Sequence, residues 1–148
     1  MTGVRPALAV VVALVLAGCH DATDPEIQRV IGRIDRSHTG KPVIVLPAEV
    51  PAGVGFSVLV HTVGPSTCTR PDGESVTVEG NLARIVPYDV VPIPGHSDVC
   101  LSDYAFHEHR LELALPASGT ARVRVVGMRA STAANVLDSV ETSVTVRP

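Results

Sequence analysis

The sequence predicts an all-β protein: a two-sheet sandwich of seven or eight strands with Greek-key connections. Apolar and polar residues alternate with period two in several short segments, as in strands that bury one face. Turn residues, drawn from 12 Gly and 12 Pro, separate these segments. No segment is both long and helical in period, so all of these observations favour strands.

The first three predicted strands span residues 26–34, 42–46 and 56–63. Pro42 restricts the second strand to an edge or a strand-opening position, because proline cannot donate to a ladder. The Pro- and Gly-rich stretch 47–55 is expected to turn the chain. The third strand should direct four side chains to one face: Phe56, Val58, Val60 and Thr62.

The next two predicted strands span residues 74–79 and 82–91, with a Gly-Asn turn between them. Alternation in the first of them is expected to place Val76 and Val78 inward. Pro87 interrupts the second, which makes that strand a candidate for an edge or a bulge.

The last three predicted strands span residues 110–115, 121–127 and 136–146, and a candidate loop at 92–103 precedes them. Leucine alternates with other residues in the first, and valine alternates with arginine in the second. Each strand therefore has one apolar face for a shared core.

The N-terminus indicates export. Arg5 precedes an uninterrupted apolar run at 7–17, which matches the charged and apolar regions of a secretory signal. This run is too short for a transmembrane helix, which needs roughly 20 apolar residues. Residues 1–18 are therefore expected to be a cleaved signal, 19–26 a short polar tether, and 27–148 one domain.

The sequence Leu-Ala-Gly-Cys that ends at Cys19 resembles the lipobox of bacterial lipoproteins. The resemblance implies that Cys19 becomes the first residue of the mature chain and carries at least two acyl chains, enough for stable anchoring. His20 stands where some lipoproteins have the Asp that retains them at the inner membrane, so the outer membrane is favoured. The alternative is an ordinary secretory signal in which Cys19 is incidental.

Cys68 and Cys100 remain as an even pair in an oxidising compartment, so a disulfide is expected between them. It would close a loop of about 33 residues and stabilise the fold by roughly 3–4 kcal/mol. A metal site that uses both thiolates is the alternative, and extracytoplasmic oxidation disfavours it.

The run VIVLPAEVPAGVGFSVLVHTVG at 43–64 resembles the opening of many bacterial immunoglobulin-like modules. It contains an apolar strand, a proline, a turn and an alternating strand that ends in glycine. The resemblance implies an immunoglobulin-like sandwich and no particular chemistry. The chain departs from antibody-type domains because it has no Trp, and its cysteines lie in or beside expected loops.

Composition and motifs exclude several functions. The net charge is −3 and the basic residues are scattered, which argues against nucleic acid as a partner. Residues 96–98 read His-Ser-Asp, but neighbours in sequence cannot adopt the geometry of a catalytic triad. No phosphate-binding or dinucleotide-binding motif is present. We therefore expect no enzyme activity and no cofactor.

One pair of residues is a candidate metal site. His107 and His109 are two apart, so on a strand their imidazoles point the same way and are able to share an ion. A real zinc site needs at least one more donor, for which His61 and His96 are the best candidates. Glu108 and Asp103 are further donors if the backbone is irregular.

The alternation of apolar residues around His107 and His109 bears on whether these two side chains face the core or the solvent. Tyr104 and Phe106 are even-numbered, whereas the apolar positions from Leu111 onward are odd-numbered. A bulge or loop end is therefore expected between Phe106 and Leu111. A break before His107 would turn both imidazoles inward, and a break after them would leave them in solvent.

The sequence favours a non-enzymatic binding or structural module of the cell envelope, anchored to a membrane by lipid and able to contact an envelope protein. A metal-binding envelope protein that uses His107 and His109, with copper or zinc as the ion, is the second hypothesis. A protease inhibitor that presents the 92–103 loop is the third.

Overall fold

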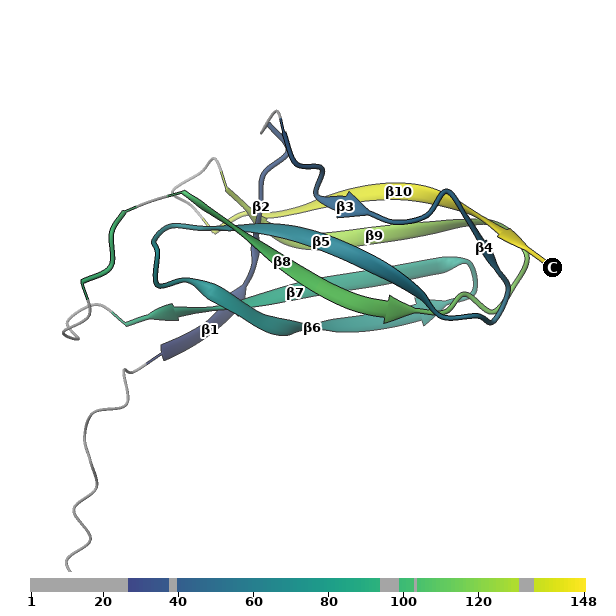
Figure 1. The fold of residues 1–148 in the computed structure, drawn as a ribbon, viewed down its shortest axis with the longest axis horizontal. Helices are drawn as coiled ribbons and strands as arrows, with labels where there is room; N and C mark the ends of the chain where they lie inside the picture. Colours follow the sequence, from purple (N-terminus) through teal and green to yellow (C-terminus); the bar gives the residue numbers. More distant parts are fainter. Residues whose placement is uncertain (1–26, 38–39, 94–98, 103, 131–134) are drawn as a thin grey trace, which may run out of the picture.

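The structure is a computed structural model that describes residues 27–37, 40–93, 99–102, 104–130 and 135–148. These residues form ten strands and no helix, so the all-β prediction is confirmed. The strands make one curled sheet around an apolar interior (Figure 1). The signal segment 1–18, Cys19 and the rest of the tether 19–26 lie outside the described residues.

The strands are β1 (Ile27–Ile31), β2 (Arg33–Ile34), β3 (Ile44–Val45), β4 (Glu49–Pro51), β5 (Phe56–Gly64), β6 (Arg70–Glu79), β7 (Leu82–Pro92), β8 (Ala105–Leu113), β9 (Gly119–Arg129) and β10 (Leu137–Arg147). Strand β7 pairs with β6, β9 and β1, and β9 pairs with β10. Strand β5 pairs with β8 and β3. The short β2 pairs with both β5 and β9, so it links these two parts of the sheet.

The strand count exceeds the expected seven or eight for two reasons. The first predicted strand divides at Gly32 into β1 and β2, and the predicted turn at 47–55 contains the short β4, which pairs in parallel with β10. A Cβ at Gly32 would lie 2.7 Å from Cγ2 of Thr62 and 3.0 Å from Oδ2 of Asp89. Gly32 lies between β1, which pairs with β7, and β2, which pairs with β5 and β9. Only glycine fits at this position, because any Cβ would be too close to Thr62 and Asp89.

The core confirms the face assigned to the third predicted strand. Phe56, Val58, Val60 and Thr62 are all buried in β5, and they pack opposite inward residues of β7 and β9 such as Ile85 and Val123. The expectation of burial for Val76 and Val78 is wrong, because each is 38% exposed. Both lie on β6, which pairs only with β7 among the described strands.

Pro87 is accommodated inside β7 by a change of partner. Strand β7 pairs with β9 up to Ile85 and with β1 from Tyr88 onward, so the missing N–H of Pro87 falls between two ladders. Its carbonyl accepts a hydrogen bond from the backbone N–H of Gly32 at 2.9 Å. The irregularity in register lies in the neighbouring β6, between Pro71 and Glu74.

The expected bulge between Phe106 and Leu111 is absent. Strand β8 pairs with β5 without a register shift from Ala105 to Leu113. The phase conflict is resolved because Tyr104 and Phe106 lie on the outer face, where they stack edge to face and Phe106 contacts Lys41. The odd-numbered residues, including His107 and His109, therefore face inward along an unbroken strand.

Candidate functional site: a buried polar cluster beside an apolar cavity

A polar cluster occupies one end of the otherwise apolar interior. Thr62 comes from β5, His109 from β8 and Asp89 from β7. Each follows the inward phase of its strand, so alternation alone places three polar side chains where valine or leucine would be expected. The side chains of Asp89 and His109 are 2% and 0% exposed.

The three side chains meet at one carboxylate oxygen. Thr62 Oγ1 donates to Asp89 Oδ1 at 3.2 Å, and His109 Nε2 lies 3.1 Å from both Asp89 Oδ1 and Thr62 Oγ1. A carboxylate only accepts, so His109 Nε2 carries the proton in this arrangement. His109 Nδ1 is buried without a partner. A second ring proton at Nδ1 would have no acceptor among the described residues.

The residue types resemble those of a hydrolytic triad, but the connectivity differs. In a triad the nucleophile and the carboxylate bind opposite nitrogens of the imidazole. Here both Thr62 and Asp89 contact Nε2 of His109. The hydroxyl of Thr62 is also fully buried, so this cluster is not arranged to activate it toward a substrate.

Asp89 also lines a cavity of about 490 Å³. The elements around the cavity are β1, β2, the end of β5 and the end of β7, which lie together on the left in Figure 1. Among the described residues, Asp89 Oδ2 has no hydrogen-bond partner. The lining residues are Gln28, Val30, Ile31, Arg33, Val63, Pro65, Ser66, Thr69, Asp89, Val91, Pro92, Met128 and Asn135.

His107 lies next to this cluster on the inner face of β8. Its Nε2 is buried without a partner, and a Cβ at Gly64 would approach it to 2.5 Å. Burial lowers the pKa of His107 below its usual 6.5; the charge of Asp89 raises it, and His109 lowers it further. Burial thus favours the neutral form of His107.

Among the described residues, the other proposed metal donors do not join the pair. His61 lies on the opposite face of β5, where its Nδ1 donates to the Pro42 carbonyl at 2.6 Å and its Nε2 lies 3.6 Å from Glu108. His96 and Asp103 lie outside the described residues. Within the described residues, no three His, Cys, Asp or Glu side chains are grouped so that they could hold a metal ion.

The cysteines lie at disulfide distance, as predicted. The sulfurs of Cys68 and Cys100 are 2.12 Å apart and their Cα atoms 5.5 Å apart. Beside them, the backbone N–H of Thr67 donates to the Leu101 carbonyl at 3.0 Å. Ser66 and Thr69, on either side of this segment, line the cavity, so the bridge holds part of the cavity wall.

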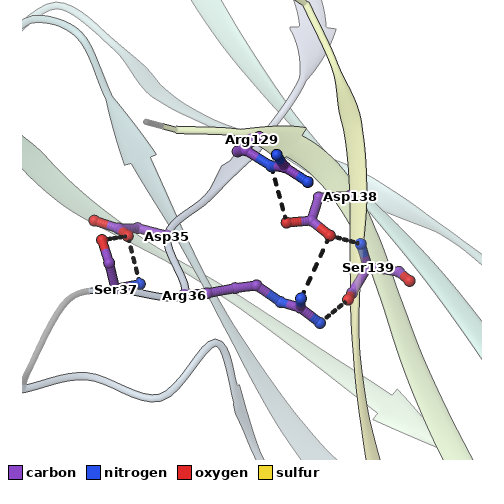
Figure 2. Close-up of polar contacts among 6 residues, drawn as sticks. All are labelled: Asp35, Arg36, Ser37, Arg129, Asp138 and Ser139. Atoms are coloured by element: carbon purple, nitrogen blue, oxygen red, sulfur yellow. Dashed lines mark hydrogen bonds and ion pairs between the residues drawn. The ribbon is translucent and has the colours of Figure 1, made fainter. Parts of the chain in front are cut away.

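A second polar cluster lies on the outer surface, where β2 ends beside β9 and β10 (Figure 2). Asp138 contacts Arg36 at 3.7 Å and Arg129 at 3.4 Å, and Arg36 donates to the Ser139 carbonyl. The backbone N–H of Ser139 lowers the pKa of Asp138, with help from the two guanidinium groups. These contacts tie three strands together, so we assign them a structural role.

Tyr104 forms a separate contact beyond this cluster. Its hydroxyl donates to Asp35 Oδ2 at 2.5 Å. Burial and the Asp35 carboxylate raise the pKa of Tyr104 to about 12. The phenol therefore stays protonated at neutral pH and secures the start of β8 to the end of β2.

Sequence reasoning missed Asp89 and the polar cluster that it forms with Thr62 and His109. One signal was available: Asp89 stands inside an apolar run, Val-Pro-Tyr-Asp-Val-Val, at the same odd phase as the inward Ile85. A buried charge of that kind needs a partner. The identity of the partner depended on strands distant in sequence.

No protein-family model, curated protein or solved structure matches this chain. None of the described residues forms a helix with the length and hydrophobicity needed to cross a membrane.

Proposed function

We propose that this chain is a non-enzymatic binding module of the bacterial envelope, anchored by lipid on Cys19, whose ligand occupies the cavity beside Asp89. One observation carries the proposal. The buried Asp89, whose Oδ2 has no hydrogen-bond partner among the described residues, lines a mainly apolar cavity of about 490 Å³. Ligand sites are typically apolar cavities of about 300–1,000 Å³ with few, well-placed polar groups.

The lipid anchor rests on the Leu-Ala-Gly-Cys motif at the end of the apolar run. From Cys19 to Ile27, where β1 begins, eight residue steps span at most about 29 Å, at ~3.3–3.6 Å each. Strand β1 contributes Gln28, Val30 and Ile31 to the cavity. Anchoring at Cys19 would therefore hold the cavity close to the bilayer, and the outer membrane is the favoured location.

An immunoglobulin-like two-sheet sandwich with Greek-key connections is part of the same proposal. Two long antiparallel pairs, β5 with β8 and β9 with β10, both contribute residues to the apolar interior, which supports this architecture. The unusual hallmark would be a polar cluster at one end of the core in place of the tryptophan found in antibody domains.

Cavity binding is tested by calorimetry on the lipidated protein in detergent, with 1-octanol as an apolar probe and empty micelles as the reference. We expect saturable binding that is lost in Val91→Trp, which fills the cavity from β7. Val54→Trp adds the same bulk at an exposed position outside the cavity lining and should leave binding intact. Equal heats for all three proteins would refute the cavity as a binding site.

The anchor is tested separately in cells. Cys19→Ala should leave an uncleaved precursor and abolish incorporation of a fatty-acid analogue. The double variant Cys68→Ala/Cys100→Ala should still be labelled, because its lipid site is intact. Normal cleavage and labelling of Cys19→Ala would show that the anchor is not at this residue.

Metal binding by His107 and His109 is the second candidate. One observation favours it: His107 Nε2 and His109 Nδ1 are both buried and have no hydrogen-bond partner. Titration with zinc or copper separates this candidate from the first. Sub-micromolar binding that is lost in His107→Ala/His109→Ala, yet kept in His61→Ala, would support the metal function.

A further inference from the structure

We propose that the cavity selects an apolar molecule bearing a single ammonium group, which binds the free oxygen of Asp89. This inference rests on the proposed binding function and specifies the chemistry of its ligand. It rests on two features of the cavity: a carboxylate oxygen with no hydrogen-bond partner among the described residues, and apolar surroundings.

No Lys or Arg side chain forms an ion pair with Asp89 among the described residues. The hydrogen bonds that its side chain accepts within this part of the chain, from Thr62 and His109, are both made to Oδ1. Arg33 also lines the cavity but forms no ion pair with Asp89. The charge of Arg33 acts instead on Tyr104, whose pKa it lowers.

A buried carboxylate with one unpartnered oxygen is costly in free energy. Taking a single ion out of water costs several kcal/mol even after relaxation, and two hydrogen bonds to one oxygen offset only part of that cost. An ammonium group placed at Oδ2 would satisfy the remaining acceptor and cancel the charge. Hydrogen bonds between two charged groups are about twice as strong as neutral ones.

The other side chains that line the cavity determine the chemistry of the remainder of the ligand. Most lining side chains are apolar, among them Val30, Ile31, Val63, Val91 and Met128. A hydrocarbon body would bury apolar surface there at about 25 cal/mol per Å². A carboxylate ligand would be repelled by Asp89, and a purely apolar ligand would leave Oδ2 desolvated and unpaired.

Three probes with the same chain and different head groups test this selectivity: octylamine, 1-octanol and octanoate at pH 7. We expect the lipidated wild-type protein to bind octylammonium roughly 10- to 100-fold more tightly than octanol, the range of one charge-assisted hydrogen bond. Octanoate should bind more weakly than octanol. Calorimetry in detergent, corrected with empty micelles, gives all three constants.

Variants assign the preference to Asp89. Asp89→Asn should bind octylammonium and octanol equally, whereas Glu112→Gln, which neutralises an exposed carboxylate of β8, should keep the wild-type preference. Melting curves establish that each variant is folded. If Asp89→Asn does not fold, the wild-type probe series decides alone, because it needs no substitution.

The outcomes separate the two proposals. Equal binding of octylammonium and octanol by the wild type, with both lost in Val91→Trp, would overturn the ligand class and leave the binding cavity standing. Failure of all three probes to bind would overturn both. A preference for octylammonium that survives in a folded Asp89→Asn would also overturn the assignment to Asp89.

Discussion

Removal of His109 should strongly destabilise the fold. His109→Leu leaves the Asp89 carboxylate buried with one hydrogen bond fewer, at a site where both side chains are at most 2% exposed. Loss of a hydrogen bond to a charged group typically costs about 1.5–3 kcal/mol. At a urea m-value of about 1.5 kcal/mol per M, the unfolding midpoint should fall by roughly 1–2 M.

The double variant Asp89→Leu/His109→Leu distinguishes the buried charge from lost packing. Replacing both members of a buried pair by apolar residues is often neutral or stabilising, so the double variant should recover most of the lost stability. His61→Leu is a matched control on the outer face, where loss of one hydrogen bond to the Pro42 carbonyl should cost about 0.5–1.5 kcal/mol.

Urea unfolding followed by circular dichroism, without reductant, gives the three free energies. A cost below about 1 kcal/mol for His109→Leu would contradict a buried carboxylate that depends on this hydrogen bond. A double variant as unstable as His109→Leu would show that the loss comes from packing and not from the stranded carboxylate.

Three further predictions follow from the same geometry. Replacing Cys68 and Cys100 by serine should lower the free energy of unfolding by about 3–4 kcal/mol, measured in urea, and reductant should then have no further effect. The pKa of His107 in the folded protein lies below 6.5, so as the pH falls the unfolded chain binds a proton at this residue before the folded protein does. The free energy of unfolding should therefore decrease from about pH 6.5 down to the folded pKa and then level off. His107→Gln should flatten that drop, and an unchanged slope would show that another group causes it. Gly64→Ala should cost about 1–3 kcal/mol, because its Cβ would lie 2.5 Å from the His107 ring, whereas Gly55→Ala, with its nearest atom at 3.6 Å, should be close to neutral.

Local alternation was sufficient to predict the approximate positions of the long strands and one shared inward face. Phe56, Val58, Val60 and Thr62 share a face because side chains alternate whatever the neighbouring strands are. The division at Gly32 was not predictable, because it depends on Thr62 and Asp89, which are distant in sequence.

The same limit explains the other errors. Val76 and Val78 alternate like core residues, yet they are exposed because β6 lies at an edge, and an edge position is a property of the whole sheet. The bulge expected near His107 assumed that aromatic residues face the core. Phe106 instead packs on the outer face, against Tyr104 and Lys41.

Strand β6 has a consequence for how copies of the chain behave when they are crowded on a surface. An open strand edge is a template on which another chain can add, and anchoring as proposed would confine many copies to one plane. Strand β6 breaks that template in two ways: Gly73, at φ +79°, marks an irregular stretch, and Pro71 and Asp72 precede it. Proline, charge and irregular register all oppose strand addition, so neighbouring copies should not polymerise through the edge of β6.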